Sequence, residues 1–374
     1  MRLYLDHNAG APLRPEARDA MLPWLGPAAN PSSAHREGAR ARAALEEARA
    51  AVAALIGAVP AEVVFTSGAT EANNLALRGA AAGGRIVSTA IEHASVLEAA
   101  RAAGMALVTV GVDGEGRVAA DDVVAACAGR PALVSVGLAN GEVGVVAPVG
   151  AIAAALAGSG AVVHTDAAQA AGRLPLDVRA LGVDLLSLSS HKLGGPAGAG
   201  ALWVRSGTAL EAQLRGGPQE RGRRAGTENV AALVGFGAAA RVAGAELAPT
   251  AARLDALSER LWQGLVAHIP DVVRNGPASG ARLPNTLNLT VPGCAGESLL
   301  VLLDLAGVAA SLGSACAAGA PEPSHVLTAM GRDADAARSG LRLSLGPRTT
   351  AADVERVVEL LPRLVAQVRG VHAA

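Results

Sequence analysis

The chain has 374 residues, of which 51% are hydrophobic, 17% are charged and only 2% are aromatic. This length allows two or more domains, and the scarcity of aromatic residues predicts a core of Ala, Val and Leu. No apolar run is long and clean enough to span a bilayer, and the N-terminus lacks the pattern of a signal peptide. Because the formal net charge is only -1, we expect a protein that binds neither nucleic acid nor membrane, and its cysteine usage predicts a reducing cytoplasm.

The few cysteines restrict the possibilities further. Three Cys residues cannot form a disulfide framework, and none of them stands in a Cys-x-x-Cys spacing. We therefore expect no metal site and a reducing compartment.

Strand-like and helix-like segments alternate through the first two thirds of the chain. The spacing of apolar residues predicts a helix over 39–55. Strand-like segments then alternate with helical stretches, at 62–66, 85–88, 106–110, 132–137, 161–165, 184–189 and 201–204. This alternation predicts an α/β domain with a mostly parallel sheet.

The pattern changes beyond about residue 250. A long helix is predicted over 251–268 and a closing helix over 351–369, with a strand pair between them at 285–289 and 340–345. These elements predict a smaller α+β domain that the N-terminal segment joins. We therefore expect a large domain at 15–250 and a small domain made of 1–14 and 251–374.

Lys192 is the only lysine among the 32 Lys and Arg residues of the chain. Lys and Arg are near-interchangeable on a solvated surface, but only the lysine ammonium is readily made to lose its proton by burial. One interpretation is a surface lysine retained by chance. However, Lys192 follows the apolar segment 184–189 and precedes the turn 194–196. This setting predicts an amine held against a site, with Ser189 and His191 as candidate phosphate ligands.

Other polar residues follow predicted strands. The segment 66–71 leads into a helix whose first N–H groups suit a phosphate, although taken alone this segment is better explained as an ordinary helix cap. Asp166 is either a helix cap or the partner of a pyridinium nitrogen, with Gln169 beside the ring oxygen. His93 could cap a helix or stack on such a ring. Because the carboxyl ends of parallel strands meet at one edge, we expect these residues around Lys192, in a pyridoxal phosphate (PLP) site.

In their order and spacing, these motifs resemble the cysteine desulfurases of the NifS/IscS type, in the class V branch of PLP-dependent aminotransferases. The resemblance covers nearly the whole chain, in the segments 4–6, 30–35, 65–71, 92–93, 140–144, 164–169, 189–192, 224–229, 311–316 and 341–345. It implies an α/β protein of the PLP-dependent transferase fold type I. The large domain would contain a mostly parallel seven-stranded sheet, and the smaller domain would be α+β.

The resemblance also implies roles for individual residues. Lys192 would carry PLP as a Schiff base, Asp166 would pair with the pyridinium nitrogen and Gln169 would contact the ring oxygen. His93 would stack on the ring and help to handle the proton of the substrate thiol. The remaining contacts would come from Ala69, Thr70, Ser189 and His191 to the phosphate, from Thr227 of a second subunit, and from Asn140 and Arg342 to the substrate carboxylate. The role of Thr227 implies a homodimer.

Removal of sulfur from cysteine needs a thiolate that attacks the substrate sulfur. Cys127 lies in a predicted helix, where a small buried hydrophobe is expected, and Cys294 lies in a loop where the family usually has no Cys. Cys316 lies among small residues in a Gly-Ser-Ala-Cys setting that matches the family's nucleophile, in its first subgroup. We therefore expect L-cysteine to yield alanine and a persulfide on Cys316, which passes its sulfur to an acceptor such as an iron–sulfur scaffold protein.

One departure and several alternatives accompany this interpretation. Gly10 and Ala11 stand where relatives usually carry two threonines, so two hydroxyl groups are missing near the expected substrate pocket. A selenocysteine lyase or an aminotransferase of the same fold is the alternative enzyme, and an inactive partner-binding scaffold is the alternative from another class. Cys316 argues against an aminotransferase, and the intact set of Lys192, Asp166 and His93 argues against a scaffold. Iron–sulfur assembly, tRNA thiolation and nitrogenase maturation all remain open as destinations for the sulfur.

Overall fold

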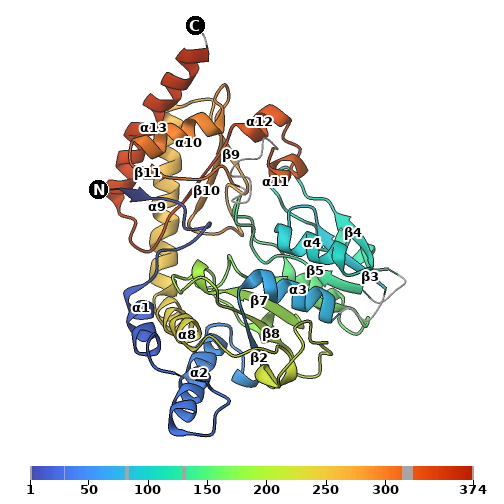
Figure 1. Cartoon of the computed structure of the whole chain (residues 1–374). Helices are drawn as coiled ribbons and strands as arrows, with labels where there is room; N and C mark the ends of the chain where they lie inside the picture. Colours follow the sequence, from blue (N-terminus) through green and yellow to red (C-terminus); the bar gives the residue numbers. More distant parts are fainter. Residues whose placement is uncertain (1, 29, 81–83, 129–131, 314–322, 373–374) are drawn as a thin grey trace.

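A seven-stranded sheet organises the N-terminal two thirds of the computed structural model, which describes residues 2–28, 30–80, 84–128, 132–313 and 323–372 (Figure 1). Its strands are β2 (Val63–Thr66), β3 (Arg85–Thr89), β4 (Ala106–Val110), β5 (Ala132–Ser135), β6 (Val162–Asp166), β7 (Leu185–Ser189) and β8 (Gly200–Val204). Their order is β2-β8-β7-β6-β5-β3-β4. Strand β8 runs opposite to the other six, so it pairs antiparallel with both β2 and β7. The predicted mostly parallel sheet of seven strands is confirmed.

Helices cover both faces of this sheet, so its strands are apolar on both sides. Along β2, Val63 and Phe65 pack toward one face and Val64 toward the other, because successive side chains of a strand alternate. The face of Val64 is covered by α3 (Ala69–Gly79) and α4 (Ala94–Ala102). The opposite face is covered by α2 (Arg36–Leu55), α5 (Ala120–Ala126), α6 (Val149–Ala155), α7 (Val178–Leu181) and α8 (Val230–Ala245), with α1 (Pro15–Met21) packed against α8.

The C-terminal part has its own sheet and its own apolar cluster. Strand β10 (Thr286–Thr290) pairs antiparallel with β12 (Gly340–Ser344) on one side and with β9 (Val273–Asn275) on the other. Helices α9 (Leu247–His268), α10 (Gly296–Leu305) and α13 (Ala351–His372) pack against this sheet, and the short helices α11 (His325–Ala329) and α12 (Ala334–Arg338) precede β12. The predicted strand pair and both long helices are confirmed.

The N-terminal segment joins this C-terminal part. Strand β1 (Leu3–Tyr4) pairs in parallel with β11 (Val308–Ala309), and Leu3 and Leu5 belong to the same hydrophobic cluster as α9 and α13 (Figure 1). The division of the chain at residues 14/15 and 250/251 stays a prediction. What the contacts establish is that residues 3–5 pack with residues that follow them by about 250 positions or more.

A membrane-spanning helix must be both long and apolar. In the described part of the chain, no single helix has both the length and the apolar composition to cross a bilayer. Helices α8 and α9 meet these requirements only when taken together, and they are bent by 71° at their junction.

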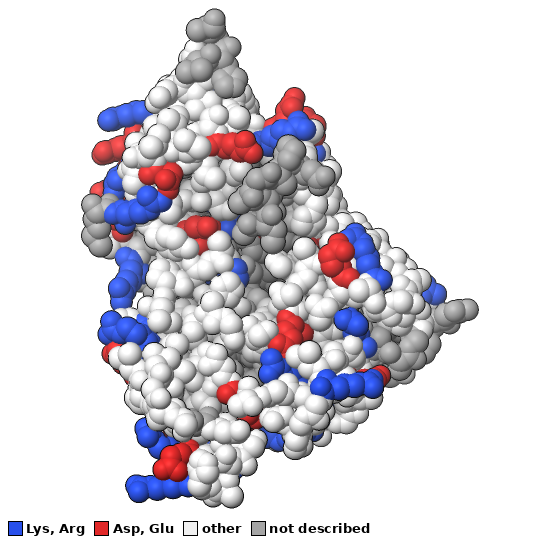
Figure 2. All heavy atoms as spheres, viewed as in Figure 1, with Lys and Arg blue, Asp and Glu red and all other residues white. Residues whose placement is uncertain are grey.

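Figure 2 shows how charge is distributed on one face of the molecule. Lys and Arg side chains lie interspersed with Asp and Glu, and the described residues of this face form no large area of a single sign. This distribution agrees with the formal net charge of -1.

A buried ion pair ties the loop before α8 to strand β2. Arg49 of α2 donates from Nη1 to Glu220 Oε2 at 2.6 Å and from Nη2 to Oε1 at 2.8 Å, and the two side chains are only 3% and 2% exposed. Glu220 Oε2 also accepts a hydrogen bond from the backbone N–H of Phe65 at 2.8 Å. Glu220 adopts a φ of 47°, which is uncommon for a residue other than glycine. The ion pair therefore fixes a strained turn in the segment that leads to Thr227.

We expect Glu220→Gln to lower the free energy of unfolding by about 3 kcal/mol, because it leaves the half-exposed Glu46, at 3.0 Å from Nε, as the remaining countercharge of the buried Arg49 guanidinium. Urea denaturation of the variant and the parent measures this difference. Glu246→Gln is the matched control, because Glu246 pairs with Arg14 but is 49% exposed, and its loss should stay below about 1 kcal/mol. Equal losses in the two variants would contradict the role assigned to the buried pair.

Candidate active site

A cavity of about 590 Å³ lies at the carboxyl ends of the parallel strands. Its lining includes ten of the predicted site residues, namely Ala69, Thr70, His93, Asn140, Asp166, Gln169, Ser189, His191, Lys192 and Arg342. Thr227 is exposed and does not line this cavity, and Cys316 lies outside the described residues. Residues from both parts of the chain therefore meet around Lys192.

Lys192 ends a short 3-10 turn, Ser190–Lys192, that directly follows strand β7. Its Nζ donates to the backbone carbonyl oxygens of Asn8 and, at 2.9 Å, of Ala9. Burial, together with the charges of Arg173 and Arg342, lowers the pKa of Lys192 to about 8, against the opposing effect of Asp166 and Asp6. An amine in this position loses its proton far more readily than a surface lysine does.

Asp166 ends strand β6, and two donors hold its carboxylate. Oδ2 accepts from Asn73 Nδ2 at 2.7 Å, and Oδ1 accepts from the backbone N–H of Ala168 at 2.9 Å. A hydrogen-bonded carboxylate therefore lies in the wall of the cavity, and its pairing with a ring nitrogen stays a prediction.

His93 is the N-cap residue of α4 and also faces the cavity. Its Nδ1 accepts a hydrogen bond from the backbone N–H of Ser95 at 3.1 Å, so the proton of the neutral ring lies on Nε2. The loss of hydration lowers the pKa of His93; Asp166 opposes this shift, and Lys192 and His325 add to it. The two interpretations of His93 from the sequence, a helix cap and a residue of the site, are therefore compatible.

Helix α3 begins at Ala69, two residues earlier than the sequence predicted, and in the described structure no side chain caps this end. Glu71 accepts from the backbone N–H of Ser67 at 2.8 Å and pairs with Arg224 at 2.8 Å. A Cβ at Gly200 would lie 2.5 Å from Gly68 Cα, so only glycine allows this close approach of β8 to the turn. The first N–H groups of α3 are thus presented to the cavity in the manner of an anion site.

The two residues predicted to bind a substrate carboxylate differ in their hydrogen bonding. Arg342 of β12 donates from Nη1 to the carbonyl oxygens of Gly141 at 3.0 Å and Gly313 at 2.6 Å, and from Nη2 to Asp6 Oδ1 at 2.7 Å. Its buried Nε has no hydrogen-bond partner among the described atoms. Asn140 instead uses its amide within its own turn and to Ile91, donating to that carbonyl at 2.9 Å. Arg342 therefore has a buried donor, Nε, that no described residue uses.

The two described cysteines are buried away from the cavity. Cys127 follows α5, is 8% exposed, and burial raises the pKa of its thiol. Cys294 is 2% exposed, and burial likewise raises the pKa of its thiol. Both are poor nucleophiles in these positions, because the thiolate is the reactive form.

Several residues of the site were not predicted from the sequence. Asn73 is fully buried on the side of α3 that packs on the sheet, and it holds Asp166. Glu92 is buried beside His93; it accepts from Thr89 Oγ1 at 2.7 Å and from the backbone N–H of Gly137 at 3.0 Å. A polar residue on an otherwise apolar helix face was the available signal for Asn73. The contact between Glu92 and Gly137 joins two loops, and no local sequence pattern predicts it.

Comparisons with known proteins agree with this geometry. The model of the aminotransferase class-V family matches residues 3–357, so the chain belongs to that family, whose members use PLP. A cysteine desulfurase from Cereibacter sphaeroides is 44% identical over 99% of this chain and 97% of its own length. The structure of a NifS-like protein from Rickettsia africae covers 98% of this chain and all of its own chain, with a TM-score of 0.91 and 32% identity. A solved structure of SspA in complex with cysteine covers 94% of this chain and all of its own, with a TM-score of 0.80 and 32% identity. Within the class V family, the chain belongs to the cysteine desulfurases.

The residues of the cavity fit PLP, which is the cofactor of the family. PLP requires an amine for covalent attachment, an acid at its ring nitrogen and donors for its phosphate. The structure places Lys192 with a lowered pKa, a hydrogen-bonded Asp166 and the uncapped start of α3 around one cavity. The fold is accordingly that of the PLP-dependent transferases of fold type I. The individual contacts to PLP stay predictions.

Glu92 should make the stability of the protein depend on pH. Burial raises the pKa of Glu92 from 4.5 to about 7, so the folded chain favours the neutral carboxyl and loses stability as the pH rises through about 7. Relative to the parent, Glu92→Gln should gain roughly 2–3 kcal/mol in the free energy of unfolding between pH 5 and pH 8. Urea denaturation of both proteins at pH 5, 6, 7 and 8 measures the gain. A difference that does not change with pH would show that Glu92 ionises without cost.

Proposed function

We propose that this chain removes the sulfur of L-cysteine, releases L-alanine and first accepts the sulfur on Cys316. One observation carries the choice of Cys316. The carbonyl oxygen of Gly313 accepts from Arg342 Nη1 at 2.6 Å, and both residues line the cavity of Lys192. Cys316 follows Gly313 by three residues, a length of chain that spans at most about 11 Å. The cysteine of the SspA complex supports the choice of substrate.

The residues of the cavity divide into a set for PLP and a set for the substrate. Lys192, Asp166, Gln169 and His93 would hold the ring; the phosphate would be held by Ala69, Thr70, Ser189, His191 and Thr227 of a second copy. When bound, PLP supplies an electron sink that stabilises negative charge at the substrate Cα. Arg342 would bind the substrate carboxylate, because a guanidinium matches the geometry of a carboxylate, with Asn140 beside it.

The chain's own groups then account for the movement of protons and sulfur. Lys192 Nζ takes the proton from Cα, which its lowered pKa permits. His93 carries its proton on Nε2 and can donate a hydrogen bond from it toward the substrate. The Cys316 thiolate forms a bond to the substrate sulfur while the Cβ–S bond breaks, and the electron pair of that bond stays with Cβ, which takes up a proton. Cα takes back the proton that Lys192 removed, so that alanine is released and the sulfur remains on Cys316 as a persulfide.

The assembly and the sulfur acceptor also belong to the proposal. Thr227 is exposed and does not line the cavity of its own chain, which supports a homodimer in which it serves the second copy's site. Arg224, three residues earlier, pairs with Glu71 at the start of α3 and so holds this loop near the phosphate end of the cavity. We place the enzyme in the cytoplasm, with an iron–sulfur scaffold protein as the acceptor of the persulfide sulfur.

Cys316→Ser should reduce the formation of alanine and sulfide from L-cysteine at least about 100-fold, because a hydroxyl does not replace the thiolate that attacks sulfur. The PLP absorption spectrum should be unchanged. Alanine is measured by amino-acid analysis and the persulfide by mass spectrometry of the intact chain.

Cys127→Ser and Cys294→Ser are the matched controls, because both thiols are buried. Each should retain turnover and the persulfide. Normal turnover by the Cys316 variant would disprove its role, and formation of an α-keto acid in place of alanine would show an aminotransferase.

A further inference from the structure

Arg173 is a buried cation without a carboxylate partner among the described residues. Its Nη1 donates to Gln169 O at 2.8 Å and to Gln169 Oε1 at 2.7 Å. Its Nη2 donates to His7 O at 3.1 Å and to Lys192 O at 3.5 Å. All four acceptors are uncharged, whereas buried charges are ordinarily paired because their desolvation is costly. The charge of Arg173 is therefore not cancelled by its own hydrogen bonds.

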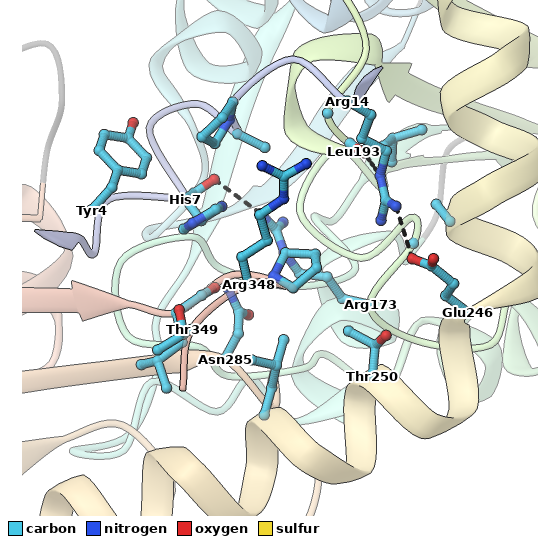
Figure 3. A pocket seen from close by; sticks show the side chains of 18 of the residues that line it. Tyr4, His7, Arg14, Arg173, Leu193, Glu246, Thr250, Asn285, Arg348 and Thr349 are labelled. Atoms are coloured by element: carbon cyan, nitrogen blue, oxygen red, sulfur yellow. Dashed lines mark hydrogen bonds and ion pairs between the residues drawn. The ribbon is translucent and has the colours of Figure 1, made fainter. Parts of the chain in front are cut away.

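Arg173 lines a second cavity of about 470 Å³ (Figure 3) and is not among the residues that line the first cavity. Lys192 lines both cavities, so it stands between them. The carboxylate of Glu246 in the second cavity pairs with Arg14 at 2.8 Å, and Arg348 has neither a hydrogen bond nor an ion pair with another described residue. Glu16 and Asp353 also line this cavity, and among the described residues none of its carboxylates forms an ion pair with Arg173.

The hydrogen bonds of Arg173 converge on the oxygens that hold Lys192. Because Arg173 binds Gln169 Oε1, the amide of Gln169 turns its Nε2 toward Asn8 O, to which it donates at 3.0 Å. Asn8 O also accepts from Lys192 Nζ, and Arg173 binds the preceding carbonyl, His7 O. The guanidinium therefore fixes the main chain at residues 7 and 8 from one side while Lys192 contacts it from the other.

We propose that Arg173 is a positioning residue for Lys192, the lysine expected to bind the cofactor. Arg173 holds the carbonyl oxygens that orient Lys192 Nζ, and its unpaired positive charge opposes protonation of this amine. The proposal rests on the proposed function only in taking Lys192 as the lysine that binds PLP. It assigns Arg173 an effect on Lys192 and no contact with substrate or cofactor.

The charged groups around Lys192 show what Arg173 contributes. Two fixed cations, Arg173 and Arg342, face two carboxylates, Asp166 and Asp6, which favour the protonated amine. Asp6 is itself paired with Arg342, and Asp166 with Asn73. The neighbouring His93, His191 and His7 have pKa values below the usual 6.5, chiefly through burial, so they are neutral above about pH 7. Arg173 is thus the cation of this group whose charge no acid balances.

The single lysine makes a direct test possible. Reductive methylation of the cofactor-free full chain with [¹³C]formaldehyde labels only Lys192 and the N-terminal amine, and a ¹H–¹³C NMR titration follows each separately. In the parent, Lys192 should titrate well below the usual 10.5. Arg173→Met should raise the pKa of Lys192 by about one unit or more, because it removes a like charge.

Two variants serve as controls, and one as a substitute. Arg14→Met removes an arginine that pairs with Glu246, and it should leave the Lys192 titration unchanged. Arg173→Lys keeps the charge and should restore a low pKa at Lys192; it adds a third labelled amine, whose signal is identified in the double variant Arg173→Lys/Lys192→Met. If circular dichroism shows that Arg173→Met does not fold, Arg173→Gln should give the same upward shift. A Lys192 pKa within about 0.3 units of the parent in a folded neutral variant would overturn the proposal. Turnover of cysteine does not enter this measurement, so it is independent of the proposed function.

Discussion

The contact of the N-terminal segment with Lys192 is the interaction on which the site depends. The carbonyl oxygens of Asn8 and Ala9 accept hydrogen bonds from the Lys192 amine, and no carboxylate of the described residues is bonded to it. Neutral acceptors orient the amine without stabilising its ammonium form as strongly as a carboxylate would. The lysine is therefore held in place and yet remains able to lose its proton.

The same short segment also joins the two sheets of the chain. Asn8 is buried and donates from Nδ2 to Gly141 O at 3.0 Å and to Thr286 Oγ1 at 2.8 Å, and its Oδ1 accepts from Asn285 Nδ2 at 3.0 Å. One asparagine thus bonds to a loop of the large sheet and to strand β10 of the small sheet, beside Lys192. Because buried amides must be satisfied, a change in the relative position of the two sheets would cost these bonds and move the carbonyls that orient the amine.

The sequence was informative where a local pattern carried the signal. The strands of the large sheet, the long helices and the polar residues that follow strands all have such patterns, and Lys192 was identified because it is the only amine side chain. Strand β9 was missed because it has three residues and only one of them, Val273, is apolar. Asn73 and Arg173 were missed for another reason: their partners, Asp166 and His7, are 93 and 166 positions away. The fold brings such pairs together, and no spacing of residues along the chain predicts them.

The site offers a physical reason why the chain has many arginines and a single lysine. A guanidinium stays charged at any physiological pH, whereas an ammonium can be tuned by its surroundings. Arg49, Arg173 and Arg342 are all buried, and each acts as a fixed charge: Arg49 against Glu220, Arg342 against Asp6, and Arg173 against no acid. Lysine is used once, at position 192, where burial and two nearby arginines favour loss of the proton. An arginine at position 192 would carry the same charge but could not release its proton, and at this position the chain has a lysine.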